Sequence, residues 1–258
     1  MSKDAPWLKH YGEVPKSIEY PDCTMAEAVL KTAKIHPELT AYSFLGEKRS
    51  YRDFASDIER TARAFKALGI VPGDRVMLYL PNVPQALECI YAINLIGAVA
   101  VMVHPLSSEG ETAFFIKNSK CRAVVALDQF YGKFAAVKAE ASPEFLILTS
   151  VKDALSPIKR MGFALTEGRK IEKVPRSAPV IHWKDFLKGG NPTEDPSEKR
   201  KPGDCAVILY SGGTTGTIKG ILLSNLNFNA LALQTLAMGN CVSAGDKMLT
   251  VMPVFHGF

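Results

Sequence analysis

Cysteine is scarce in this sequence, and its spacing excludes two common uses of the residue. The five cysteines are scattered over 258 residues, their number is odd, and no two of them form a C-x-x-C pair. Neither a disulfide framework nor a zinc site built from thiolates is therefore indicated. We expect reduced thiols, as in a cytosolic protein.

Long apolar runs are also scarce. The N-terminus has no apolar core of signal-peptide length. Only residues 86–103 come near the length of about 20 apolar residues that a membrane-spanning helix needs. That run carries Glu88 and Asn94 and is divided by Gly97, so we expect a buried helix followed by a buried strand.

An excess of one charge is confined to a single segment. The twelve basic and seven acidic side chains of residues 152–201 account for the whole net charge of +5. A local basic segment differs from the extended basic face of a general nucleic-acid-binding protein, so we expect no nucleic-acid partner. Two interpretations of the segment remain open, a solvated surface excursion and a contact with an anionic membrane surface. The membrane interpretation depends on apolar side chains interleaved with basic ones, namely Met161, Phe163 and Leu165 among Lys159, Arg160, Arg169, Lys170, Lys173 and Arg176.

Short apolar segments alternate with segments of helix length in the first part of the chain. Strands are expected at residues 75–80, 98–103, 122–127 and 144–149, and helices at residues 50–69, 84–97, 109–119 and 131–141. Ser50 is the expected N-cap of the first helix, and Gly69 stands where that helix should end. The alternation predicts βαβ units and an α/β fold with mostly parallel sheets flanked by helices.

Three regions are expected along the chain. Residues 1–150 form a first α/β sub-domain, residues 151–202 a basic surface excursion or linker, and residues 203–258 the start of a second α/β sub-domain. We expect the second sub-domain to begin a sheet of its own, with strands around residues 205–210 and 248–252.

The stretch SGGTTGTIKG, residues 211–220, contains four glycines, four hydroxyl side chains and one lysine. It is not a P-loop of the form G-x-x-x-x-G-K-[ST], because Lys219 lies between Ile218 and Gly220. The expected order is strand, loop, short strand and then a helix capped by Ser224, whereas a P-loop leads directly into a helix.

Such a loop can still bind phosphate. Glycines allow successive backbone N–H groups to converge on an anion, hydroxyl groups add donors, and the Lys219 ammonium adds a mobile positive charge. An ordinary tight turn needs only one or two glycines. The composition therefore favours phosphate binding over a purely structural turn.

The stretch YSGGTTGTIKG resembles the phosphate-binding signature S-G-[ST]-T-G-x-P-K-G of the AMP-forming acyl-CoA synthetases, a branch of the adenylate-forming superfamily. Gly212 stands where serine is usual, and this Gly-Gly form is common in the long-chain branch. Ile218 stands where proline is usual, which we expect to loosen the loop. VMPVFHGF at residues 251–258 resembles the next signature of the family, an apolar strand ending in Pro-x-[FY]-His. The resemblance covers nearly the whole chain.

The resemblance implies roles for individual residues. Lys219 would be the catalytic side chain, and His256 would line the acyl pocket near the substrate carboxylate. No metal ligand is assigned. The residues that would close over the β- and γ-phosphates of ATP, together with Lys219, are Ser211, Gly212, Gly213, Thr214, Thr215 and Gly216. The histidines given no functional role are His10, His36, His104 and His182.

The resemblance also implies a reaction. A fatty acid or another carboxylic acid would be activated with ATP and Mg²⁺ as an acyl-adenylate and then transferred to coenzyme A. Full-length relatives continue for about as long again, so we expect this chain to be the N-terminal portion of the large domain of such an enzyme. We expect it to be inactive alone and prone to self-association, in the cytoplasm or against the inner face of the membrane. The alternative is a non-catalytic nucleotide- or acyl-binding module, or one half of a split ligase.

Overall fold

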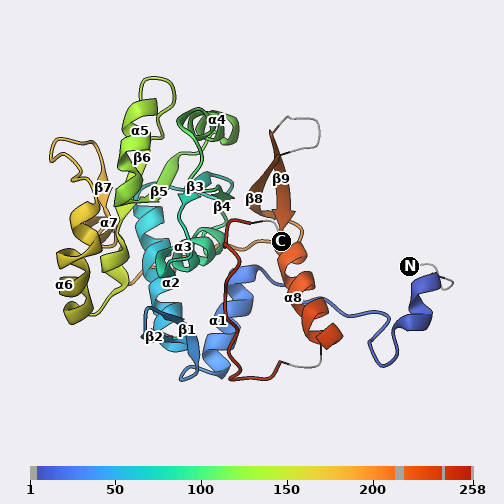
Figure 1. The fold of residues 1–258 in the computed structure, drawn as a ribbon. Coiled ribbons are helices and arrows are strands. Elements are labelled where there is room, and N and C mark those ends of the chain that lie inside the picture. Colours follow the sequence, from blue (N-terminus) through green and yellow to red (C-terminus); the bar gives the residue numbers. More distant parts are fainter. Residues whose placement is uncertain (1–4, 213–217, 240–241, 257–258) are drawn as a thin grey trace.

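The computed structural model describes residues 5–212, 218–239 and 242–256. Its centre is a seven-stranded sheet in which every neighbouring pair of strands is parallel except the last. The strands, in their order across the sheet (Figure 1), are β7 (Ile181–His182), β6 (Phe145–Thr149), β5 (Ala123–Leu127), β3 (Arg75–Tyr79), β4 (Val99–Met102), β8 (Cys205–Gly212) and β9 (Ile218–Ser224).

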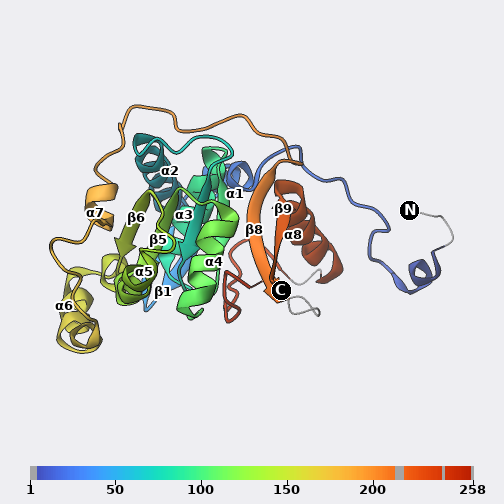
Figure 2. The ribbon, with the colours of Figure 1, turned by 90° about the horizontal axis from the view of Figure 1, so that it is seen from above.

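Helices cover both faces of this sheet. On one face α1 (Met25–Ile35), α2 (Tyr51–Ala67) and α3 (Pro84–Leu95) pack against one another, and on the other α4 (Glu109–Ser119) packs against α5 (Tyr131–Val137). Figure 2 shows the layers from above. A parallel sheet needs such crossover helices between its strands, so the α/β prediction is confirmed. The remaining elements are η1 (Pro6–His10), β1 (Thr40–Phe44), β2 (Glu47–Ser50), η2 (Asp128–Phe130), η3 (Val151–Ala154), α6 (Pro157–Leu165), η4 (Glu167–Lys170), α7 (Trp183–Phe186) and α8 (Asn225–Gly239).

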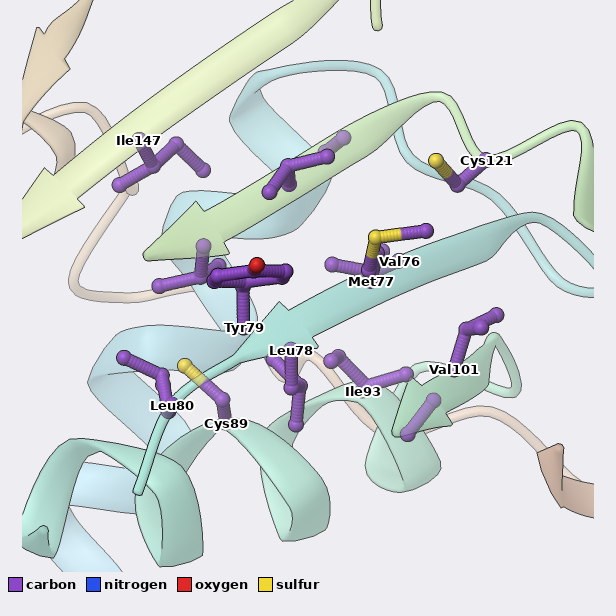
Figure 3. Close-up of a cluster of buried hydrophobic side chains, with 14 of the residues drawn as sticks. Val76, Met77, Leu78, Tyr79, Leu80, Cys89, Ile93, Val101, Cys121 and Ile147 are labelled. Atoms are coloured by element: carbon purple, nitrogen blue, oxygen red, sulfur yellow. The ribbon is translucent and has the colours of Figure 1, made fainter. Parts of the chain in front are cut away.

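The side chains of β3 alternate between the two layers. Leu78 points toward α3, near Ile93, while Met77 and Tyr79 point to the opposite face (Figure 3). All of these side chains are at most 1% exposed. Because both faces of the central strands are buried, their sequence is an almost continuous apolar run rather than an alternating one.

The apolar run at residues 86–103 forms most of α3 and the whole of β4, as predicted. Gly97 makes the turn between them with a φ of +71°, a left-handed conformation that glycine adopts without strain. Its carbonyl accepts a hydrogen bond from the Gly73 N–H at 2.9 Å. Among the described residues, no helix combines the length and apolar character needed to cross a membrane.

Local signals at the helix ends are also confirmed. The Ser50 hydroxyl accepts a hydrogen bond from the Asp53 N–H at 3.1 Å at the start of α2, and Gly69, just beyond its end, has a φ of +77°. The described cysteines form no disulfide.

The expectation of a separate second sheet is wrong. β8 lies beside β4 in parallel register, with Ala100 paired to Val207 and Met102 to Leu209. The free edge of β4 carries unpaired backbone groups, and the apolar strand β8 satisfies them while burying Val207 completely. The proposed boundaries between sub-domains, at residues 150 and 203, stay a prediction.

Residues 248–252 form no strand, so that expectation is wrong as well. Met248, Leu249 and Val251 are 72–84% exposed. A strand is stable only when a neighbouring strand pairs with its backbone, and no described strand lies beside this segment.

The basic segment is more structured than a linker. After β6 the chain forms η3, α6 and η4, and it then adds β7 to the sheet edge and buries Trp183 and Phe186. The stretch at residues 187–204 then returns across the molecule to β8 (Figure 2). The Arg63 Nε–H of α2 donates to the Glu194 carbonyl at 2.7 Å, which holds this returning stretch against the helix layer.

Candidate functional site at the carboxyl edge of the sheet

Three neighbouring strands bring the candidate site together. β3, β4 and β8 are adjacent and parallel, so their carboxyl ends meet at one edge of the sheet. Asn82 follows β3, His104 follows β4, and the glycine-rich loop follows β8. In open α/β sheets, ligands bind beyond this edge.

The β8–β9 hairpin carries the predicted phosphate-binding residues. Ser211 pairs with Lys219 and Gly212 with Ile218 in the antiparallel ladder. Of the residues assigned to phosphate binding, Ser211, Gly212 and Lys219 therefore lie in the two strands that flank residues 213–217. The Lys219 side chain is exposed and forms no ion pair with any other described residue. The other residues assigned to phosphate binding, Gly213, Thr214, Thr215 and Gly216, lie outside the described residues.

Tyr210 fixes this hairpin to the helix layer. Its ring lies 4.6 Å from that of Phe115 between centroids, and its hydroxyl donates to Asn118 Oδ1 at 2.8 Å. Burial raises the pKa of Tyr210, which keeps the hydroxyl protonated as a donor. A Cβ at Gly220 would lie 3.3 Å from the side chain of Ile208 and 3.4 Å from the Tyr210 ring. Gly220 therefore has a packing role against the opposite strand.

Buried amides connect the end of the hairpin to the rest of the fold. Asn225, the first residue of α8, accepts a hydrogen bond at Oδ1 from Asn94 Nδ2 at 2.7 Å and another from the Met25 N–H at 3.1 Å. At the cap, Ser224 Oγ accepts from the Asn227 N–H at 3.3 Å, so the predicted second strand and the helix capped by Ser224 are confirmed. The residues predicted to form the loop, 213–217, lie outside the described residues. The sequence analysis noted Asn94 only as a polar break in an apolar run.

The Asn82 side chain holds the segment that carries His256. Asn82 Nδ2 donates to the Met252 carbonyl at 2.9 Å, and Asn82 Oδ1 accepts from the Val254 N–H at 2.8 Å. The ring of Phe255 lies 4.7 Å from that of His104 between centroids. His256 is exposed, and its backbone N–H donates to the Pro253 carbonyl at 2.9 Å.

The sequence analysis missed Asn82 and gave His104 no functional role. Each follows a buried strand by two or three residues, which is where a parallel sheet presents its polar groups. The position just after a buried strand could therefore have identified both Asn82 and His104 from the sequence. Their partners in the 250–256 segment could not be inferred locally, because they lie about 150 residues or more away in sequence.

A lysine occupies the point where the strand order reverses, between β3 and β5. Lys133 Nζ donates to the Ser107 carbonyl at 2.5 Å and to the Tyr79 hydroxyl at 3.3 Å. It also lies 5.7 Å from the centroid of the Tyr79 ring and 5.8 Å from that of Phe130. The ammonium group therefore fixes the turn after β4 through carbonyl and π contacts.

A second polar cluster lies between the β1–β2 hairpin and the start of α3. Glu88 is 8% exposed and lines a cavity of about 350 Å³ together with Tyr42, Arg49 and Asp57. Burial, followed by the charge of Asp57, raises the pKa of Glu88 to about 7. Asp57 itself is paired with Arg49 at 2.6 Å and with Arg60 at 2.9 Å. Within the described part of the chain, Glu88 therefore forms no ion pair of its own.

The described part of the chain offers no cluster of three or more His, Cys, Asp or Glu side chains that could hold a metal ion. The functional groups at the carboxyl edge of the sheet are instead a lysine ammonium, a serine hydroxyl and backbone N–H groups. These groups suit an anionic ligand.

The chain is similar to known proteins in family, sequence and fold. The family described as AMP-binding enzyme matches residues 29–258. The chain is 29% identical to a long-chain-fatty-acid–CoA ligase of Bacillus subtilis, over 99% of this chain and 46% of the relative. It is 28% identical to a crotonobetaine/carnitine–CoA ligase of Salmonella agona, over 80% of this chain and 36% of the relative.

Among solved structures, a long-chain-fatty-acid–CoA ligase from Archaeoglobus fulgidus superposes with a TM-score of 0.74 at 23% identity, covering 93% of this chain and 44% of that one. The likeness shows the fold. The chain spans about half the length of the curated relatives that it matches.

Proposed function

The chain belongs to the family of AMP-binding enzymes, and from that membership we propose that the natural protein is an ATP-dependent acid–thiol ligase. We propose fatty acids as its substrates, because the Bacillus subtilis relative is a long-chain-fatty-acid–CoA ligase. The ligase of crotonobetaine or carnitine, a smaller acid, matches less of this chain.

The observation that carries the proposal is the β8–β9 hairpin. A loop rich in glycine and hydroxyl groups joins two antiparallel strands at the carboxyl edge of the sheet, and Ser211 and Lys219 face each other at its base. We assign the β- and γ-phosphates of ATP to this loop. Lys219 supports the assignment because its charge is exposed and unpaired within the described structure.

The proposed reaction has two steps. A carboxylate oxygen of the acid attacks the α-phosphorus of ATP, and the bond to the bridging oxygen breaks as pyrophosphate leaves. The sulfur of coenzyme A then attacks the acyl carbon of the adenylate, AMP leaves, and the thiol proton is released. Negative charge grows on the departing pyrophosphate in the first step. Lys219 and the loop donors would stabilise that charge without forming a covalent bond.

Magnesium is proposed to enter as the ATP complex, where it neutralises phosphate charge. No described residues form a cluster fit to hold it, so we assign no step to a protein-bound metal. His256 is proposed to line the acyl pocket, and Asn82 would position it by holding the preceding backbone. We place the protein in the cytoplasm, with contact at a membrane surface that is argued below.

The test is acid-dependent exchange of pyrophosphate into ATP by the natural protein, followed by detection of the thioester by mass spectrometry. Acids of four, eight and sixteen carbons are compared. We expect exchange without coenzyme A and thioester only with it, at the highest rate for one of the longer acids. Nucleotide binding without exchange for any acid would identify a non-catalytic module instead.

A further inference from the structure

Helix α6 is amphipathic, but its apolar face points to solvent instead of to the core. Its apolar residues Ile158, Met161 and Leu165 follow the spacing i, i+3, i+7 and therefore lie on one face. They are 80%, 63% and 55% exposed. A helix at the surface of a globular protein normally turns such a face to the core.

The charged side chains of α6 are turned toward the protein. Lys159 Nζ donates to the Leu45 carbonyl at 2.8 Å and pairs with Glu47 at 3.1 Å. Arg160 Nε donates to the Lys152 carbonyl at 3.1 Å. These contacts fix the rotation of the helix about its axis, so the outward orientation of the apolar face is built into the fold.

The helix also projects from the body of the molecule. Figures 1 and 2 both place α6 at the far end of the sheet from α8, outside the layers of helices that cover the strands.

The chain around α6 is basic. Residues 152–176 hold seven basic and three acidic side chains. Among the described residues, Lys170 is paired with Glu167, while Arg169, Lys173 and Arg176 are exposed and form no ion pair. The exposed apolar stripe of α6 is therefore followed along the chain by unpaired cations, a combination typical of segments that lie in a membrane interface.

We propose that α6 docks on an anionic lipid surface, with Ile158, Met161 and Leu165 inserted between headgroups and with Arg169, Lys173 and Arg176 against lipid phosphates. The purpose of this docking rests on the proposed function, because a ligase for long-chain acids would collect its substrate from the lipid surface. The docking itself does not depend on the proposed function. A second copy of the chain is disfavoured as the occupant, because pairing two such faces would bring like charges together.

The experiment is flotation of the purified protein with vesicles of phosphatidylcholine alone or mixed with phosphatidylglycerol. The apolar variant is Ile158→Ser/Met161→Ser, and its control is Met238→Ser, which removes a side chain 73% exposed on α8. The charge variant is Arg169→Gln/Lys173→Gln/Arg176→Gln, and its control is Lys31→Gln/Lys34→Gln on α1, where both lysines are exposed. Salt is varied from 50 to 500 mM.

We expect the parent protein to bind the anionic vesicles only. This binding should be weakened at least tenfold in the apolar variant, in the charge variant and at high salt. Neither control variant should change it. Equal binding to both vesicle types, equal binding by all variants, or no binding by the parent protein would each overturn the proposal. A parent dimer that the apolar variant makes monomeric, without vesicle binding, would show an interface between copies instead. When the same substitutions are made in the natural protein, pyrophosphate exchange with octanoate should be the same in the parent and all four variants, so a failure of vesicle binding leaves the ligase proposal standing.

Discussion

Lys219 stands opposite Ser211 at the base of the loop, where its charge has no partner among the described residues. We predict that Lys219→Ala slows acyl-adenylate formation by the natural protein while leaving carboxylate binding largely intact. The reason is that its charge acts on phosphate oxygens, and losing one such contact costs about 2–4 kcal/mol, or on the order of 10² in rate. Pyrophosphate exchange measures the effect, with Lys31→Ala on α1 as the control. Exchange at the parental rate would show that the assigned role is wrong.

The environment of Glu88 makes the stability of the fold depend on pH near neutrality. Its pKa of about 7 in the folded protein lies above the ordinary value for glutamate. The folded state therefore binds more protons than the unfolded state between about pH 4.5 and 7, and stability contributed by the neutral carboxyl is lost as pH rises through that window.

We predict that Glu88→Gln leaves the free energy of unfolding nearly unchanged at pH 4 and raises it at pH 8 relative to the parent. The gain is about 3 kcal/mol at most, from about 1.4 kcal/mol for each pKa unit of difference. Urea unfolding at both pH values measures it. Glu109→Gln, at an exposed position at the start of α4, is the control. A gain of equal size at both pH values would contradict the predicted titration.

At the scale of elements, the turn from α3 to β4 depends on Gly97. An added Cβ would strain a φ of +71° and would lie 3.0 Å from Arg200 Cδ and 3.3 Å from Pro72 Cβ. We predict that Gly97→Ala lowers the free energy of unfolding by about 1–2 kcal/mol. Gly110→Ala, in α4 with no atom within 4 Å of the added Cβ, should change it by about 0.5 kcal/mol or less. Equal results for the two variants in urea unfolding would refute the strain argument.

The elements that could be predicted from the sequence are those fixed by neighbouring residues. Apolar runs, caps and glycine stops define β3 to β6, α2 to α5 and the order around the glycine-rich loop, because periodicity and capping act within a few residues. The pairing of β8 with β4 was not predictable in this way. Nothing local to residues 205–210 distinguishes a strand that starts a new sheet from one that completes an existing edge.

Local sequence likewise does not determine the orientation of α6 or the long-range contacts of the candidate site. Residues 157–165 were expected only as part of a basic surface excursion, and contacts such as Lys159 with Glu47 determine which face of α6 points outward. The loop and Lys219 could be found from residue types alone. Asn82 could not be linked to the 250–254 segment, because a hydrogen bond between distant segments leaves no local pattern.

At the scale of the whole molecule, the chain spans about half the length of its curated relatives. We predict that the 258-residue polypeptide alone makes no detectable acyl-CoA from ATP, palmitate and coenzyme A. The curated relatives are about twice as long as this chain, and misplaced reactants forfeit up to roughly 7–11 kcal/mol of the gain from orientation. Mass spectrometry of the thioester decides this. Turnover by this polypeptide would refute both the prediction and the site assignment.

The exposed apolar surface leads to a prediction about association. In the described structure β9 is an edge strand with Leu222 67% exposed, and Leu249 in the following segment is 84% exposed. Such edges and patches promote association. We predict that the purified 258-residue polypeptide forms concentration-dependent oligomers in light scattering and that Leu222→Lys reduces them. Val71→Lys, which changes an exposed apolar residue on a turn, should not. A monomeric parent at all concentrations would contradict the prediction.

The returning stretch at residues 187–204 also has a consequence for synthesis on the ribosome. β4 is translated about a hundred residues before β8, the strand that completes its edge. At about 5–20 residues per second, the nascent chain carries β4 with that edge open for on the order of 5–20 s. During that interval a chaperone at the exit tunnel would have an unpaired apolar strand to bind, and slow translation of residues 152–202 would lengthen the exposure.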